Sequence, residues 1–368
     1  LYTDFLGEYS AGLYGHSNPK IQAAIKAALD EGIVLCAPNE YEVQLADLIC
    51  QRFPSCDRVR FCNSGTEGNL MAISAARAYT GRTHVMVFNG AYHGGVFYFV
   101  SGGSEINAPY PFIVAEYNDL EHASDLIDRH AHELAAILVE PMLGAGGCIA
   151  ADPDFLRGLR AATERHGIVL IFDEVMTSRL SSGGMQKRLE IIPDLTVLGK
   201  YLGGGLTFGA FGGRADIMDR FDPRSSNALP HAGTFNNNVL TMVAGLTGLR
   251  DIFTPEVAET HNSRGEQFRT ELTALIKEHD FPAQVTGIGS LMCVHMQRSL
   301  IRRPADAATL NPSVMALFHL KMLAGGIYLS RRGFMSLSLP LREIDYRSYL
   351  EAFGEFMETS TTQFTETF

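Results

Sequence analysis

Residues 168–175 read Ile-Val-Leu-Ile-Phe-Asp-Glu-Val. The unbroken apolar run is typical of a parallel strand that is covered on both faces, and a carboxylate, Asp173, follows it directly. Burying a charge at such a strand end is costly unless a partner neutralises it. The stretch therefore predicts a core strand that delivers Asp173 to a ligand. A protonated ring nitrogen is one such partner, while a metal ligand or an ordinary turn carboxylate has the same pattern.

Comparable apolar runs surround this stretch. They occupy residues 85–88, 136–139 and 195–198, and helical segments such as 155–165 alternate with them. Such alternation is typical of right-handed β-α-β crossovers, in which ligands bind beyond the carboxyl ends of the strands. The predicted fold class is α/β, with a large domain built on a mainly parallel, helix-covered sheet.

The pattern changes after about residue 250, which predicts a second domain. Amphipathic helical runs at 257–278 and 314–323 alternate there with short strands. We expect residues 251–368 to form a smaller α+β domain, residues 36–250 to form the large ligand-binding domain, and residues 1–35 to join the small domain.

Composition excludes several classes of function. The 368 residues carry a net charge of -11 without a basic block, which disfavours a nucleic-acid partner. No apolar run reaches the roughly 18 to 20 residues that span a bilayer, so we expect no membrane insertion. The six cysteines include no Cys-x-x-Cys pair, which indicates a reducing, cytoplasmic location.

Residues 63–68, Asn-Ser-Gly-Thr-Glu-Gly, lead from a strand-like run into the helical run 70–78. A helix N-terminus offers unpaired N–H groups and the positive end of the helix dipole, which suits a phosphate. Gly65 permits close backbone approach, and Ser64 and Thr66 add hydroxyl donors. Since Ser and Thr also begin many helices that bind nothing, a plain capping turn stays open as an alternative.

Two further strand ends carry chemically useful side chains. Tyr92 and His93 stand among glycines in residues 90–95, where a flat ring would stack on the tyrosine, although a packed tyrosine in a Gly-rich loop has the same pattern. Lys200 ends another apolar run, and three glycines follow at 203–205. Most lysines are solvated, but burial at a strand end lowers a lysine pKa and frees the amine as nucleophile and base.

These segments, in this order and spacing, resemble the class III aminotransferases of pyridoxal-phosphate (PLP) fold type I. The likeness is greatest to the branch that contains glutamate-1-semialdehyde aminomutase and the β-amino-acid aminotransferases. It rests on residues 63–67, 92–94, 139–141, 172–177, 199–200, 209–213 and 233–235. Within that branch, residues 176–180, 233–238 and 332–334 look most like bacterial β-phenylalanine aminotransferases.

The resemblance implies a PLP-dependent transferase fold and a role for each matched residue. Lys200 would form the internal aldimine, Asp173 would pair with the pyridine nitrogen, and Tyr92 would stack on the ring opposite Val175. The other implied cofactor-binding residues are Ser64, Gly65 and Thr66 at the phosphate, Thr234 at the phosphate of the neighbouring subunit, and His93 and Glu140. Because Thr234 would serve the neighbouring subunit, a homodimer with shared active sites is implied. Gly68 stands where the family is expected to have alanine.

The implied reaction is a ping-pong transamination from an amino acid, such as β-phenylalanine, to a keto acid. Lys200 would move the proton, and Arg332 would bind a substrate carboxylate through its planar fork. A second such arginine of the β-phenylalanine group would precede Leu1. An aminomutase that moves the amine within one molecule, or a racemase, would use the same residues, and no metal is implied. A non-enzymatic ligand sensor is disfavoured, since no basic DNA-binding segment is visible.

Overall fold

A computed structural model describes residues 1–35, 37–307 and 312–364 of the chain. These residues divide into two compact units. The larger unit comprises residues 16–146 and 151–258, and the smaller unit comprises residues 1–15, 147–150 and the described part of 259–368. Compact units are not identical with domains, so the expected boundaries at residues 35 and 250 stay a prediction.

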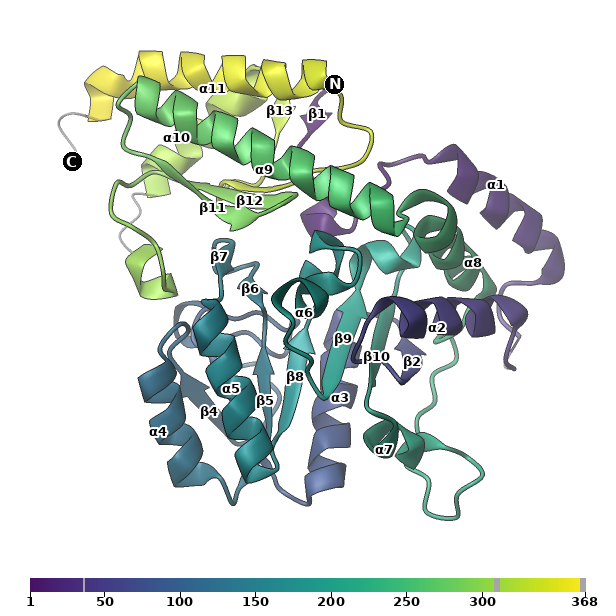
Figure 1. Cartoon of the computed structure of the whole chain (residues 1–368). Coiled ribbons are helices and arrows are strands. Elements are labelled where there is room, and N and C mark those ends of the chain that lie inside the picture. The colour runs from purple at the N-terminus through teal and green to yellow at the C-terminus, as the bar shows by residue number, and fades with distance from the viewer. Residues whose placement is uncertain (36, 308–311, 365–368) are drawn as a thin grey trace. The chain divides into compact units, whose positions relative to one another are not determined.

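The larger unit is built on a twisted sheet whose described strands run in the order β2-β10-β9-β8-β5-β3-β4 (Figure 1). Their bounds are β2 Arg58–Cys62, β3 His84–Phe88, β4 Phe112–Ala115, β5 Leu134–Val139, β8 Val169–Asp173, β9 Leu195–Gly199 and β10 Gly209–Gly213. Neighbouring strands pair in parallel except at β10, which is antiparallel to both neighbours. The predicted mainly parallel sheet is confirmed, but β10 did not stand out as a strand because glycines occupy three of its five positions.

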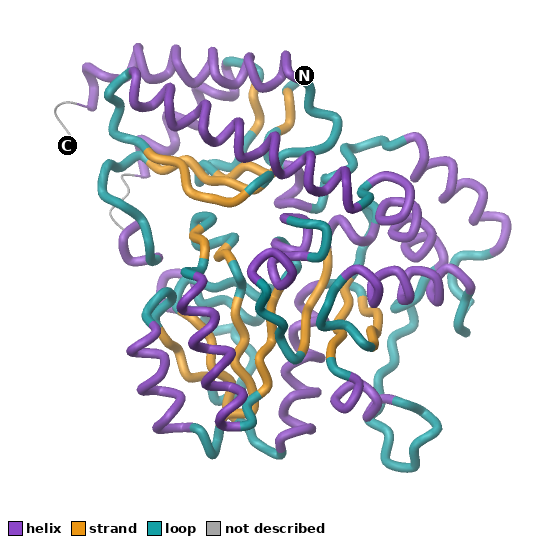
Figure 2. The backbone as a smooth tube through the Cα atoms, viewed as in Figure 1, coloured by secondary structure: helices purple, strands orange, loops and turns teal. Residues whose placement is uncertain are grey.

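Helices cover this sheet, as the purple coils around the orange strands show (Figure 2). The described α-helices that lie wholly in the larger unit are α1 Pro19–Ala28, α2 Glu40–Arg52, α3 Gly65–Thr80, α4 Leu120–His130, α5 Pro153–His166, α6 Gly184–Leu189, α7 Ala215–Met218 and α8 Val239–Thr247. Of these, α1 packs on α8 and not on the sheet. Proline stands at the first position of α1 and of α5, where its missing N–H costs nothing, and Asn18 and Asp152 cap those helices. No described helix has the length and apolarity to cross a bilayer.

The smaller unit contains an antiparallel sheet in the order β11-β12-β14. Its described elements include β1 Thr3–Asp4, β7 Ile149–Ala150, β11 Gln284–Ile288, β12 Leu291–His295, β13 Ile327–Tyr328, β14 Phe334–Ser336, most of α9 Pro255–Glu278, α10 Pro312–Ala324 and α11 Glu343–Phe364. Its core is rich in aromatic rings. The ring centroids of Phe5, Phe268 and Tyr349, for example, lie within 5.9 Å of one another. Both predicted helical runs are confirmed by α9 and α10, and the short strands expected beside them are present.

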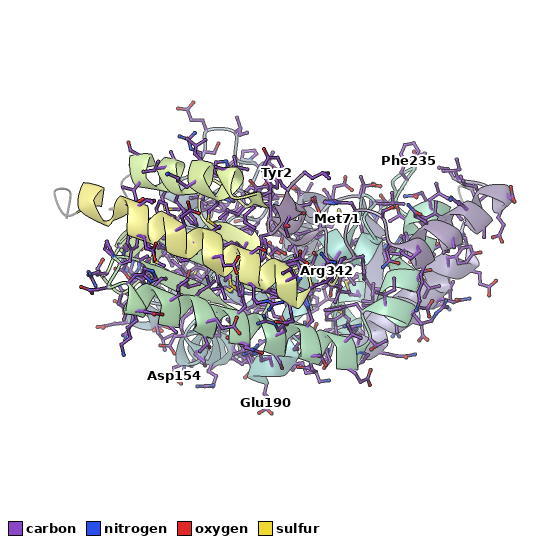
Figure 3. All side chains as sticks on the ribbon, turned by 90° about the horizontal axis from the view of Figure 1, so that it is seen from above. Tyr2, Met71, Asp154, Glu190, Phe235 and Arg342 are labelled. Carbon is purple, nitrogen blue, oxygen red and sulfur yellow. The ribbon has the colours of Figure 1, made fainter. Side chains whose placement is uncertain are left out.

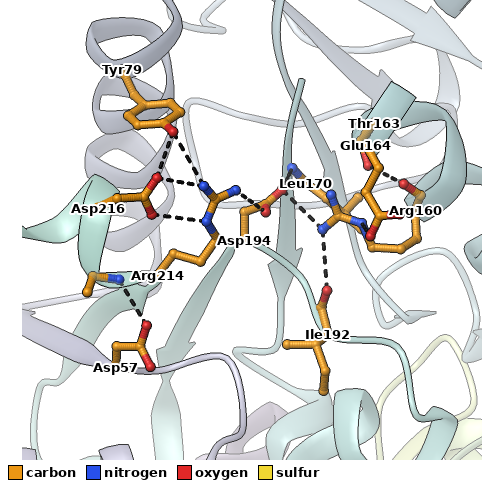
Figure 4. A network of polar contacts seen from close by, with 11 residues as sticks. Asp57, Tyr79, Arg160, Thr163, Glu164, Leu170, Ile192, Asp194, Arg214 and Asp216 are labelled. Carbon is orange, nitrogen blue, oxygen red and sulfur yellow. Dashed lines mark hydrogen bonds and ion pairs between the residues drawn. The ribbon is translucent and has the colours of Figure 1, made fainter. Parts of the chain in front are cut away.

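The buried carboxylate of Asp194 connects strand β8 with two arginines at the edge of the sheet where β8 and β9 begin (Figure 4). Its Oδ1 pairs with Arg214 at 2.8 Å, and its Oδ2 pairs with Arg160 at 3.1 Å. The Leu170 N–H also donates to Oδ2, at 2.7 Å. Asp194 lies at the amino end of β9, away from the carboxyl ends where a ligand is expected, so we interpret this network as structural.

Helix α3 lies unusually close to strands β9 and β10 at Gly68. A Cβ on this residue would come within 2.8 Å of Val197 Cγ1 and 3.0 Å of the Ala210 carbonyl oxygen. Real Cβ atoms avoid such approaches, so an alanine would push the helix away from the sheet. The departure from the expected alanine at this position therefore has a packing cause.

We predict that Gly68→Ala destabilises the protein by about 1 to 3 kcal/mol, because overpacking outweighs the gain in helix propensity. Gly354→Ala is the matched control, since Gly354 also lies inside a helix but, apart from that helix's own backbone, no atom of the described residues stands within 4 Å of its added Cβ. That control should stabilise the protein by about 1 kcal/mol. Urea unfolding of both variants measures the difference, and equal stabilisation by the two alanines would contradict the packing argument.

Candidate active site

A cavity of about 310 Å³ opens in the larger unit where several strands end. Its lining residues are Asn63, Ser64, Gly65, Thr66, Asn69, Tyr92, His93, Gly94, Glu140, Asp173, Val175, Met176, Lys200, Leu206, Thr207 and Phe208. The ends of β2, β3, β5, β8 and β9 all contribute residues to it. This is the crevice in which open α/β sheets bind ligands.

One wall of the cavity is the start of helix α3. Ser64 is the N-cap, and its Oγ accepts a hydrogen bond from the Glu67 N–H at 3.2 Å. Glu67 Oε2 accepts from the N–H of Asn63, the residue before the N-cap, at 2.9 Å, so the Glu67 side chain reaches back over the helix start without forming a capping box with Ser64. The capping alternative is thus realised in the geometry, and it leaves the helix N-terminus directed at the cavity as an anion site.

Gly94 lies directly against this helix start. Its φ is +124°, a conformation that favours glycine, and an added Cβ would come within 2.6 Å of Thr66 Cβ. Gly65 is equally confined, since its added Cβ would meet Val175 Cγ2 at 2.8 Å. Both glycines therefore allow segments of the cavity wall to pack more closely than any larger residue would permit.

Asp173 ends strand β8 and is 4% exposed. The Val175 N–H donates to its Oδ1 at 3.0 Å, and Asn69 Nδ2 donates to its Oδ2 at 2.8 Å. His93 Nδ1 lies 2.8 Å from the same Oδ2. The cost of burying this carboxylate is thus offset by three hydrogen-bonding groups.

Glu140 follows strand β5 and holds the loop that carries Tyr92. Its Oε1 accepts from the Tyr92 N–H and its Oε2 from the Gly144 N–H, each at 2.9 Å. Burial raises the pKa of Glu140 to about 7, against the opposing effect of nearby His93. The Tyr92 side chain is 41% exposed, so one of its faces is available for a planar ligand.

Lys200 follows strand β9 and is partly buried. Burial lowers its pKa, while the charges of Asp173 and Glu140 oppose this shift. Its backbone has a φ of +55°, which is costly for a residue with a side chain, and strain of this kind is tolerated where the surrounding structure fixes it. Lys200 is therefore not the solvated surface lysine of the alternative interpretation.

Glu174 directly follows Asp173 in the sequence motif, and its hydrogen bonds give it a structural role. It is fully buried and accepts hydrogen bonds from the Met185 N–H at 2.6 Å and the Gln186 N–H at 3.0 Å. The Thr177 hydroxyl donates to it at 3.1 Å. Glu174 thereby fixes the chain that leaves Asp173, without lining the cavity itself.

Most of the residues predicted for the site lie together in the cavity lining. They are Ser64, Gly65, Thr66, Tyr92, His93, Glu140, Asp173, Val175 and Lys200. Thr234 belongs to the larger unit but lies exposed in the segment before α8, and it does not line this cavity. Arg332 belongs to the smaller unit, on an exposed turn before β14. Their expected roles stay predictions.

Sequence reasoning missed several lining residues. Asn69 had a usable signal, because it stands four positions after Gly65 and so lies on the same face of the helix. Leu206, Thr207 and Phe208 had none, since they lie in an irregular segment after the glycine run. Only folding places them beside Lys200 in the cavity wall.

The lining combines an amine whose charge is disfavoured, a buried carboxylate and an anion-binding helix start within one cavity. A nucleophilic amine forms a covalent imine with an aldehyde, and a carboxylate holds a protonated ring nitrogen. The site thus fits a flat, phosphorylated heterocycle that carries an aldehyde, which is the chemistry of pyridoxal 5'-phosphate.

Comparisons with known proteins agree with this chemistry. The family model for class III aminotransferases matches residues 1–338. A β-phenylalanine transaminase from Variovorax paradoxus is 50% identical over 97% of this chain and 82% of its own length. A crystal structure of a β-phenylalanine aminotransferase from that organism has a TM-score of 0.96 at 49% identity, covering 98% of this chain and 84% of the other.

A glutamate-1-semialdehyde 2,1-aminomutase from Syntrophomonas wolfei is more distant. It is 36% identical over 89% of this chain and 79% of its own length. The higher identity therefore favours transfer of the amino group between molecules over the mutase and racemase alternatives. The chain belongs to the class III aminotransferases and is an enzyme that transfers amino groups with pyridoxal 5'-phosphate as its cofactor.

Proposed function

We propose that this enzyme takes the amino group from a β-amino acid and passes it to a keto acid, with Lys200 as the residue that binds the cofactor covalently. The observation that carries the assignment of Lys200 is its place beside Asp173 in the cavity that begins at the α3 N-terminus. PLP, when bound, supplies an electron sink for the carbanion that forms on the substrate carbon.

The chain's own residues have separate tasks in this proposal. The N–H groups and hydroxyls of residues 64–66 bind the phosphate, and Tyr92 and Val175 enclose the ring. Asp173 holds a proton on the ring nitrogen because its negative charge stabilises the protonated form. Glu140 accepts a hydrogen bond from the Tyr92 N–H, and His93 is hydrogen-bonded to Asp173. Both residues thereby complete the wall around the cofactor.

Lys200 is also the proposed base. Once the substrate amine has displaced it from the cofactor, its Nζ would take the proton from the amine-bearing carbon of the substrate and would deliver that proton to the cofactor, where the amino group remains. A neutral amine is needed for that step, and burial lowers the Lys200 pKa in the required direction.

Two observations support a β-amino acid as the amino donor. They are the similarity to the β-phenylalanine transaminase and the apolar residues of the cavity wall. The β-phenylalanine transaminase shares half of the residues. Met176, Leu206 and Phe208 add apolar surface to the lining, which suits an aryl side chain. Arg332 remains the proposed partner of the substrate carboxylate, because its planar guanidinium matches that group.

The donor assignment predicts that β-phenylalanine alone converts the purified holoenzyme to its pyridoxamine form in a single turnover, which absorbance measures. Product accumulation should then require an added keto acid, since the amino group has to leave the enzyme. Conversion of a single substrate without any acceptor would instead indicate a mutase or racemase. α-Phenylalanine is the matched control, and a faster turnover with it would contradict the β-amino acid assignment.

We further propose that the enzyme is a homodimer in which Thr234 binds the cofactor phosphate of the partner subunit. Thr234 is exposed, and the neighbouring Phe235 is 58% exposed at the periphery of the molecule (Figure 3). The segment is held from its own subunit, since Asn63 Nδ2 donates to Asn236 Oδ1 at 2.9 Å. A shared site requires a hydroxyl that can donate to the partner's cofactor and an exposed apolar side chain that can pack on the partner. Thr234 and Phe235 offer both groups on a segment that its own subunit holds in place.

A mixing experiment tests this arrangement. Lys200→Ala and Thr234→Ala are each expected to lose activity, the second through an about tenfold weaker affinity for PLP. Dimers formed from one copy of each variant should regain one intact site, and thus about half of the wild-type activity per dimer. The intact site would combine Lys200 of one subunit with Thr234 of the other. No recovery in purified mixed dimers would contradict the sharing of sites.

A further inference from the structure

Asn69 is a buried polar residue on the sheet-facing side of α3, and it lines the cavity. It is 1% exposed, and its buried neighbours Ala72, Ile73 and Ala76 are all apolar. A residue that only packs a helix on a sheet would be apolar too. The amide therefore calls for a function other than packing.

The hydrogen bonds of Asn69 fix how its amide is turned. Its Nδ2 donates to Asp173 Oδ2 at 2.8 Å and to the His93 carbonyl oxygen at 3.0 Å. Both partners can only accept, so chemistry assigns the nitrogen to this side of the amide. The Asn69 Oδ1 is buried without a partner among the described residues, so no hydrogen bond to Oδ1 favours the opposite orientation of the amide.

The same logic settles the proton on His93. Its Nδ1 lies 2.8 Å from Asp173 Oδ2, and a carboxylate oxygen accepts, so Nδ1 carries the hydrogen. His93 Nε2 is buried and has no partner in the described part of the chain. Two donors thus converge on Oδ2, whereas Oδ1 accepts only the Val175 N–H among the hydrogen bonds of the structure and keeps a lone pair for a ligand.

We propose that Asn69 is a positioning residue of the reaction: its uncharged amide, together with His93, holds the Asp173 carboxylate ionised and turned towards the ring nitrogen of the cofactor. An amide can do this without neutralising the charge, whereas an arginine or lysine at this position would cancel it. The inference rests on the proposed placement of PLP between Asp173 and Lys200.

Two substitutions that keep the number of side-chain heavy atoms separate the functions of the amide. Asn69→Leu removes the donor, and Asn69→Asp replaces it with a second carboxylate next to Asp173, so that the pair has to share a proton. In both variants Asp173 stabilises the protonated ring nitrogen less well. Ser74→Ala is the matched control, because Ser74 lies on the same helix outside the cavity and makes only a 3.5 Å contact with Tyr110.

The readout is the absorption of the lysine-bound cofactor between pH 5 and 10, measured without substrate. A ring with less positive charge leaves its imine nitrogen more basic, so the pH midpoint of the absorbance change should rise by about one unit in Asn69→Leu and Asn69→Asp. The donor half-reaction should slow about tenfold, in proportion to one lost charge-assisted hydrogen bond. Ser74→Ala should match the wild type in both measurements.

Thermal unfolding of the cofactor-free variants shows whether they fold. If Asn69→Leu does not fold, His93→Gln and His93→Leu give the same comparison at the other donor, with only the leucine raising the midpoint. Folded variants that bind PLP and keep the wild-type midpoint and half-reaction rate would overturn the positioning role alone. A wild-type chain that takes up no PLP would instead overturn the proposed function, so the two failures are distinguishable.

Discussion

A negative charge placed inside the protein at the end of β8 is the constraint on which the site depends. Asp173 is tolerated there because the backbone of Val175, the amide of Asn69 and the ring of His93 all face it. These groups come from the strand end itself, from α3 and from the loop after β3. The fold has to bring the three together, and in doing so it forms the wall of the cavity.

Burial acts in opposite directions on the pKa values of Glu140 and Lys200, two further ionisable groups of the cavity. It raises the pKa of Glu140 to about 7 and lowers that of Lys200, because it disfavours the charged form of each. Both shifts bring proton exchange closer to neutral pH, where a base and its conjugate acid are both accessible. The positive φ of Lys200 adds a local conformational cost, which the interactions of the surrounding structure offset.

Much of this arrangement could be predicted from the sequence because it lies at strand ends. Apolar runs located the parallel strands, and the polar residues that directly follow them, such as Asp173 and Lys200, line one cavity. Strand β10 escaped the same reasoning, since its glycines give no strand signal. Asn69 and Phe208 were missed for another reason: helix faces and irregular segments reach the cavity only through tertiary packing. Gly68 shows the same limit, because its role is the space it leaves for Val197.

The central claim, that Lys200 carries the cofactor, is tested most directly by reducing the PLP-loaded enzyme with borohydride and mapping the modified peptide by mass spectrometry. We expect a phosphopyridoxyl group on the peptide that contains Lys200 and on no other lysine, and no modification in Lys200→Ala. A modified lysine elsewhere, or an unmodified Lys200 in an enzyme that shows the absorption of bound PLP, would contradict it.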